Sequence, residues 1–270
     1  MKFYAIILMA WPCIIVQGQS VTTQMDARAA GMANSSATFT GGASLFNNPG
    51  GLNYEIPVAF FAYEVTPQLP GSNRTAAAIL LPLKPGVAAA GIFRFGDDLY
   101  SEQVASVGFG SKMGITSLGL RANYVQYQAQ GYQTQHAMSI SFGGITAITK
   151  QISIGAYITN LNQARIADTE LLPTKLIAGI SIRPNESFLA STEIEKDLTY
   201  GATWRTGAEY SVNRKIFFRS GFHINPSAGF FGVGMNAKRM TCDFAMKLSQ
   251  VPGNSFQASA TYKLKAGKNP

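Results

Sequence analysis

The sequence predicts an all-β fold, a transmembrane antiparallel up-and-down β-barrel of about 14 strands. Three observations predict it: the composition, the alternation of apolar and polar residues, and the order of short and long connections. Of the 270 residues, 13% are charged, 11% are aromatic and 27 are glycine, and the mean hydropathy is +0.07. Soluble domains carry about 25% charged residues. A barrel alternates lipid-facing apolar residues with small or polar lumen residues, so its mean hydropathy stays near zero.

The first residues have the layout of a secretory signal peptide, which we assign to residues 1–18. Lys2 precedes an apolar run over residues 3–16, and small or polar residues follow. This run is shorter than the ~20 residues of a membrane-spanning helix. A lipoprotein signal is the alternative, because Cys13 lies in the run. After cleavage behind Gly18 only Cys242 remains, so no intramolecular disulfide can form, which favours a bacterial envelope protein.

Residues 19–56 precede the first expected strand and are predicted to form an N-terminal plug or hatch. The stretch from Arg28 to Leu52 is rich in Gly, Ala, Ser and Asn, is nearly free of charge and ends in the turn NNPGG. Small side chains permit close approach of the backbone. We therefore expect this segment to pack in the lumen and to leave no open aqueous pore.

Residues 57–270 are predicted to form the barrel, because apolar and polar residues alternate in short segments bounded by turn residues. The expected strands are 57–66, 73–83, 86–96, 101–112, 115–128, 132–147, 151–161, 174–183, 187–197, 202–212, 215–224, 228–237, 239–249 and 255–265. Connections after even-numbered strands are tight and those after odd-numbered strands are longer, as in outer-membrane barrels with short periplasmic turns. This order predicts that both termini are periplasmic. A soluble all-β secreted protein is the alternative, but short and long loops are not expected to alternate in this way in a soluble β-sandwich.

Alternation also assigns charged side chains to the lumen, where acids and bases should pair, since isolated buried charges are costly. The predicted lumen network consists of Arg121, Arg183, Glu193, Glu195, Arg205, Glu209 and Arg219. The aromatic residues Phe60, Phe218, Phe222 and Phe230 are expected on the lipid-facing wall.

No constellation in the sequence predicts catalysis, a cofactor or a metal site. Glu193, Glu195 and Asp197 stand two residues apart and raise the possibility of glycoside hydrolysis, but the neighbouring arginines favour a structural network. The two histidines, His136 and His223, belong to no nucleophile elbow or metal-spaced motif. The formal charge of +8 comes from scattered Lys and Arg, without a nucleic-acid-binding module.

The run DARAAGMANSSATF and the later SLFNNPGGL resemble the N-terminal signature of FadL-like outer-membrane barrels, especially the PorV and PorQ branch associated with type IX secretion. The residues that carry the resemblance include Arg28, Met32, Asn48, Pro49 and Gly51. The resemblance implies a barrel in the bacterial outer membrane that acts as a non-enzymatic accessory or partner-binding component of a type IX secretion or gliding complex. The alternative function is FadL-like transport of small hydrophobic molecules across the outer membrane.

The expected partners are outer-membrane lipid and a larger outer-membrane complex, such as a secretion translocon, and not nucleic acid. The longest expected outer loop covers residues 161–173, and its Leu171, Leu172 and Pro173 are the candidate partner contact. Folding of this loop back over the barrel mouth is an equal alternative, because either arrangement covers its apolar residues.

Overall fold

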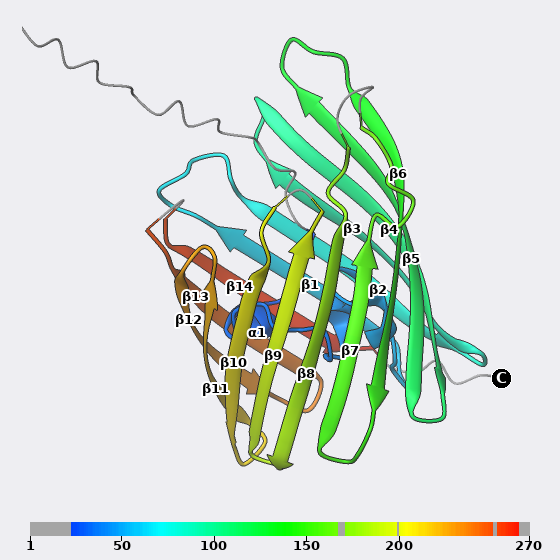
Figure 1. The fold of residues 1–270 in the computed structure, drawn as a ribbon, viewed down its shortest axis with the longest axis vertical. Helices are drawn as coiled ribbons and strands as arrows, with labels where there is room; N and C mark the ends of the chain where they lie inside the picture. The colour runs from blue at the N-terminus through cyan, green and yellow to red at the C-terminus, as the bar shows by residue number, and fades with distance from the viewer. Residues whose placement is uncertain (1–22, 167–170, 199, 251–252, 265–270) are drawn as a thin grey trace, which may run out of the picture.

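The chain folds into one closed antiparallel barrel of 14 strands, each paired with its neighbours in sequence and the last paired with the first (Figure 1). The computed structural model describes residues 23–166, 171–198, 200–250 and 253–264, so the expected signal peptide lies outside the described residues. The predicted fold class is confirmed. The strands are β1 Val58–Val65, β2 Arg74–Leu83, β3 Gly86–Gly96, β4 Tyr100–Met113, β5 Thr116–Ala129, β6 Gln135–Ala147, β7 Ile152–Thr159, β8 Lys175–Asn185, β9 Phe188–Asp197, β10 Thr203–Val212, β11 Ile216–Ile224, β12 Ala228–Asn236, β13 Met240–Leu248 and β14 Ser255–Lys263.

The two ends of the barrel differ in their connections. At one end, which we call the short-turn end, tight turns join β2 to β3 and every later even-numbered strand to its successor, and β1 begins beside the end of β14. At the other, the long-loop end, the longer connections follow the odd-numbered strands. The pairing registers around the wall are continuous in the described strands except for one shift between Ile182 and Asn185 of β8. Pro184 lies within this shift, so its lack of a backbone N–H removes no hydrogen bond from the regular strand pairing.

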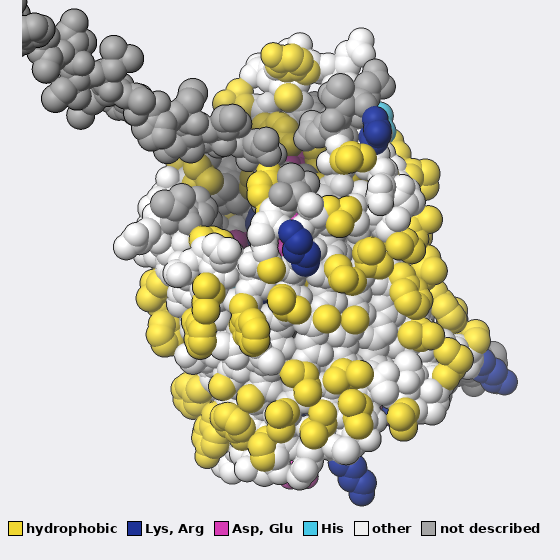
Figure 2. Space-filling view, viewed as in Figure 1, with side chains coloured by type: hydrophobic (Ala, Val, Ile, Leu, Met, Phe, Trp, Pro, Cys, Tyr) yellow, Lys and Arg dark blue, Asp and Glu magenta, His cyan; other side chains and the backbone are white. Residues whose placement is uncertain are grey.

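Alternation along each strand separates an outer apolar face from an inner face of small and polar residues. In β5, Leu120 is 50% exposed, whereas the adjacent Arg121 is only 2% exposed and faces the lumen. Large apolar side chains cover the outside of the wall over most of its height (Figure 2). This surface suits contact with lipid tails, as in outer-membrane barrels.

Two of the four aromatic residues expected on the outer wall lie inside. Phe218 and Phe222 are exposed as expected, but Phe60 and Phe230 are buried. Neighbouring residues of a strand point to opposite faces, and in both cases the next residue, Phe61 or Phe231, takes the outer position. Within the barrel, the Phe60 ring packs on Phe46, and the Phe230 ring on His223.

Residues 23–56, which we call the N-terminal segment, run through the barrel interior (Figure 1). The segment contains one turn of α-helix, α1 Ala27–Ala30, and two 3₁₀ turns, η1 Gly42–Leu45 and η2 Pro49–Gly51. Asp26 caps α1 by accepting a hydrogen bond from the Arg28 N–H, and Asn48 caps η2 by accepting one from Gly50. These side chains hold a path that has little regular structure of its own.

Candidate lumen site

The N-terminal segment lies against glycines on the inner face of the wall, which let two backbones approach closely. A Cβ added to Gly50 would lie 2.6 Å from Cα of Gly144 in β6, so no larger residue fits there without a shift. A Cβ added to Gly207 in β10 would lie 2.6 Å from Cβ of Met32, and Gly31 faces Gly232 of β12 in the same way. The absence of side chains at these positions is therefore what allows the segment to dock.

The first charged cluster joins the segment to strands β10, β11 and β13. Arg28 donates two hydrogen bonds to the Glu209 carboxylate, each 2.9 Å long. Arg219 donates to the same carboxylate at 2.7 Å and to Asp243 at 2.7 Å. Glu209 is thus held between two guanidinium groups, the forked geometry in which arginine binds carboxylates best. Nearby, burial and the charge of Asp243 together raise the pKa of Asp26 to about 6.

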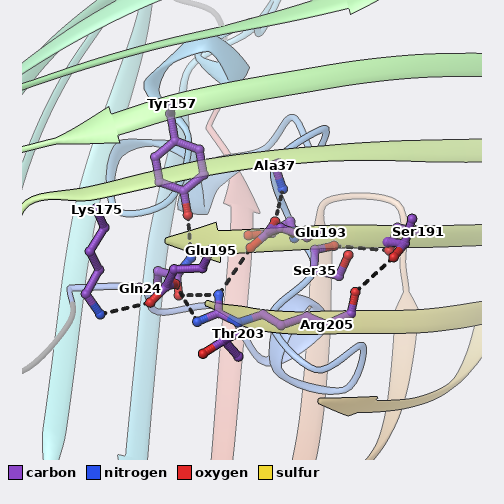
Figure 3. A network of polar contacts seen from close by, with 12 residues as sticks. Gln24, Ser35, Ala37, Tyr157, Lys175, Ser191, Glu193, Glu195, Thr203 and Arg205 are labelled. Carbon is purple, nitrogen blue, oxygen red and sulfur yellow. Dashed lines mark hydrogen bonds and ion pairs between the residues drawn. The ribbon is translucent and has the colours of Figure 1, made fainter. Parts of the chain in front are cut away.

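The second charged cluster lies on β8, β9 and β10, nearer the long-loop end (Figure 3). Arg205 bridges Glu193 and Glu195, and Lys175 donates to Glu195 at 3.0 Å. The remaining Glu193 oxygen, Oε2, accepts hydrogen bonds from the backbone N–H of Ser36 at 2.9 Å and of the next residue at 2.8 Å. Glu193 therefore binds the segment directly, with its charge balanced by Arg205.

The remaining two arginines of the predicted network have different surroundings. Arg121 is buried and donates to the backbone oxygen of Leu45 at 2.6 Å and to the Ser141 hydroxyl at 3.2 Å, so it too holds the segment. Arg183 lies near the short-turn end, where its side chain is exposed. The structure thus places Glu193, Glu195 and Arg205 together, and Glu209 with Arg219. Arg121 binds elsewhere, and Arg183 lies within electrostatic range of Arg28 and Glu209.

Sequence reasoning missed Lys175 and Asp243 as members of these clusters. Both are on the inner face of their strands, at alternating positions that could have been found by extending the same pattern used for Arg205 and Glu209. Arg28 was selected only for its resemblance to a family motif. Its pairing with Glu209 spans 181 residues and depends on the path of the segment, which no local pattern records.

The family-motif residues lie at contacts between the segment and the barrel. Met32 is fully buried against Gly207, and Asn48 donates from Nδ2 to the backbone oxygens of Ala37 and Gly144. Pro49 and Gly51 form η2 with Gly50 and are buried. These residues therefore determine how the segment packs inside the wall.

A cavity of about 80 Å³ lies between the segment and strands β4 to β9 on the long-loop side of the lumen. The residues that line it include Phe46 from the segment, Val104, Val125 and Ile177 from the wall, and Leu172 from the loop after β7. Most of the lining residues are polar, and Glu102, Arg121, Lys175 and Glu195 are charged. Gln24 donates a hydrogen bond to the Tyr157 hydroxyl at its edge.

The expected partner loop folds inward in part. Leu172 is buried, its N–H donates to Ala164 and its oxygen accepts a 2.8 Å hydrogen bond from Asn160. Pro173 lines the cavity, whereas Leu171 is 55% exposed. Of the three candidate residues, Leu171 is the one left free to meet a partner. Residues 167–170 lie outside the described residues.

The other side chains that raised chemical possibilities occupy ordinary positions. His136 shares a 2.8 Å hydrogen bond with the Tyr124 hydroxyl on the outer side, and His223 packs on Phe230 inside. Within the described ranges there is no group of three or more His, Cys, Asp or Glu placed to hold a metal ion. In the same part of the chain, no helix has the length and apolar character needed to cross a membrane.

Neither a known family model nor a curated protein matches the sequence. Solved structures do match. A monoaromatic hydrocarbon channel, CymD, has a TM-score of 0.72 at 12% identity, covering 91% of this chain and 99% of its own. The toluene transporter TodX of Pseudomonas putida has a TM-score of 0.66 at 12% identity, covering 91% and 100%.

A FadL homologue of Pseudomonas aeruginosa has a TM-score of 0.60 at 11% identity, covering 89% of this chain and 98% of its own. The first two proteins are described as a channel and a transporter, which is consistent with a non-enzymatic barrel. The PorV and PorQ branch stays a prediction. At these identities the likeness establishes the fold, and this chain has the fold of the FadL-type channels of the outer membrane.

Proposed function

We propose that this barrel carries small hydrophobic molecules across the outer membrane through its lumen, entering at the long-loop end. The observation that supports this most is the cavity at that end, where the apolar residues Phe46, Val104, Val125 and Leu172 lie among polar and charged ones. Small-molecule sites are concave and combine apolar side chains with polar groups that orient the ligand. The similar structures described as a hydrocarbon channel and a toluene transporter favour the same function.

Transport requires the N-terminal segment to move. The cavity of about 80 Å³ is smaller than the ~150 Å³ apolar cavity that accommodates benzene in an engineered protein. Its floor is formed by the segment, through Phe46. The described strands pair without a gap in the membrane-facing wall, and the one shift lies near the short-turn end. We therefore place the exit along the lumen, past the segment, and not sideways through the wall.

The segment then acts as the plug predicted for residues 19–56, with the short-turn end in the periplasm. This orientation puts Leu264 on the periplasmic side, and it leaves Gln24 in the lumen toward the long-loop end, close to Arg74 and Tyr157. The purified protein is expected to show no steady ion conductance in planar bilayers. Removal of residues up to Leu52 should open a channel or destabilise the barrel.

A reversible lock tests the transport proposal. In a Cys242→Ser background, Ser35→Cys with Ser191→Cys places two thiols where the segment meets β9, because the Ser191 hydroxyl donates a 3.2 Å hydrogen bond to the Ser35 backbone oxygen and both positions already carry a Cβ. We expect oxidised protein to lose toluene uptake in a deletion strain and reduced protein to regain it, with Ser35→Cys alone as the control. Equal uptake with and without the lock would reject passage along the lumen.

The accessory role in type IX secretion rests on the sequence resemblance alone. The same deletion strain distinguishes it from transport. Loss of secreted cargo or gliding with normal uptake of hydrophobic molecules would favour the accessory role. Affinity purification from a mild detergent extract tests the expected larger complex, with Leu171→Asp as the variant of the exposed loop residue. A barrel recovered without partners, from a strain whose deletion leaves secretion normal, would reject it.

A further inference from the structure

Each of the six tight turns at the short-turn end carries an exposed Lys or Arg. We call one such cation from each turn the basic ring, which consists of Lys84, Lys112, Lys150, Arg183, Lys215 and Arg239. In the described residues at this end, the exposed acids are Glu55 and Glu186, and Glu186 is already paired with Arg214. Figure 2 shows cationic side chains projecting beyond the lower edge of the wall. The short-turn end therefore has a large excess of positive charge.

Each cation of the basic ring lies one or two residues from a large apolar side chain on the outer wall. These apolar neighbours, between 43% and 60% exposed, are Leu83, Met113, Ile148, Ile182, Ile216 and Met240. Lys112 and Arg183 occupy inner positions at the ends of their strands. The other four, Lys84, Lys150, Lys215 and Arg239, lie in the turns, where a long aliphatic stem can follow apolar surface while the charged group reaches a polar layer. The repeated pair marks the level at which the hydrocarbon layer ends and headgroups begin.

The long-loop end has a different arrangement of charge. Exposed side chains there include Asp97 and Asp98 as well as Arg94, Arg165 and Lys196. Both signs are present at this end. An ordinary scatter of surface charge therefore describes the long-loop end but not the short-turn end.

We propose that the basic ring binds the phosphate groups of anionic phospholipids in the leaflet at the short-turn end. The four turn cations, after β2, β6, β10 and β12, are spread around the perimeter as annular lipids are, whereas docking of an acidic protein would call for a patch on one side. Basic residues next to an apolar surface are attracted to anionic lipid headgroups. Binding to the ring does not depend on what the lumen carries.

The test compares annular lipids around the full mature chain. The protein is reconstituted in nanodiscs of equal phosphatidylglycerol and phosphatidylcholine, extracted with its nearest lipids, and the ratio of the two lipids is measured. The ring variant is Lys84→Gln, Lys150→Gln and Lys215→Gln together. The matched control is the long-loop triple variant Arg94→Gln, Arg165→Gln and Lys196→Gln. Heat-modifiable gel migration checks that each variant is folded.

We expect the wild type and the long-loop control to enrich phosphatidylglycerol about threefold, and the ring variant to lose most of that enrichment. In 1 M salt, where the Debye length is about 3 Å, the wild type should lose it as well, which tests the proposal without any mutation. Equal enrichment by the wild type and the ring variant would overturn the proposal. The proposal would also be overturned if the ring variant kept the lipid ratio of the wild type but no longer bound an acidic protein that the wild type binds.

Discussion

Replacing Glu193 by Gln should release the N-terminal segment from the wall. Glu193 Oε2 accepts hydrogen bonds of 2.9 and 2.8 Å from the backbone of Ser36 and Ala37, and Oε1 accepts one from Arg205. Hydrogen bonds to a charged group contribute about 1.5–3 kcal/mol each. Gln keeps one acceptor oxygen but loses the charge, so docking should weaken by about 2–3 kcal/mol. This change raises the undocked population about 30- to 150-fold.

The assay measures how often the segment leaves the wall. Ser36→Cys is introduced with Cys242→Ser, since the Ser36 hydroxyl is buried and has no hydrogen bond within the described residues. A water-soluble maleimide reacts with Cys at position 36 only after undocking, so its rate follows the undocked population. Glu193→Gln should raise this rate about 30- to 150-fold.

The matched control is Glu186→Gln, because Glu186 is an exposed acid that forms a surface pair with Arg214. Surface pairs contribute under about 1 kcal/mol, so the labelling rate should stay within about fivefold of that of the parent protein. If Glu193→Gln and Glu186→Gln label at the same rate, Glu193 does not hold the segment and the reasoning fails.

Three further predictions concern packing, protonation and the loop. Gly207→Ala should raise the same labelling rate about tenfold through overpacking, whereas Gly229→Ala, whose added Cβ meets nothing within 4 Å, should not; equal rates would argue against close docking. Because the pKa of Asp26 is raised in the folded state, its contribution to stability is present below about pH 4 and lost as pH rises through about 6. Asp26→Asn should therefore stabilise the protein at pH 7, by about 1 kcal/mol, and not at pH 4 in denaturant titrations; a pH-independent effect would contradict this. Leu172→Ala should destabilise by about 2 kcal/mol and the exposed Leu171→Ala by under about 0.5 kcal/mol, measured by thermal melting; equal losses would mean that the loop does not fold inward.

The strands could be predicted from the sequence because their signals are local. Alternation, turn residues and the order of loop lengths each depend on residues a few positions apart. The same alternation assigned Arg121 and Glu193 to the lumen face, and both are buried. The errors at Phe60 and Phe230 arose because aromatic character was given more weight than parity. Two adjacent phenylalanines cannot both face lipid on one strand.

The contacts of the N-terminal segment could not be predicted in this way. Gly207 and Gly232 carry no side chain to show a direction, and their importance appears only when the segment lies against them. The bond between Arg28 and Glu209 joins positions 181 residues apart, and its formation depends on both the barrel register and the segment path. The sequence shows which charges face inward, but it does not show which of them pair.

The paired lumen charges bear directly on the choice between the two functions. If these charged groups were unpaired and lined an open lumen, they would oppose passage of a hydrophobic molecule, because an apolar ligand cannot form hydrogen bonds with them. In the structure, however, Glu193 and Glu209 are occupied by the segment and by neighbouring arginines. Nearer the mouth, Val104 and Leu172 line the cavity together with the charged residues Glu102, Arg121, Lys175 and Glu195. Under the transport proposal a hydrophobic molecule therefore already meets Lys175 and Glu195, which are paired with each other. It meets Glu193 and Glu209 only when the segment has moved, together with the Arg28 that neutralises Glu209.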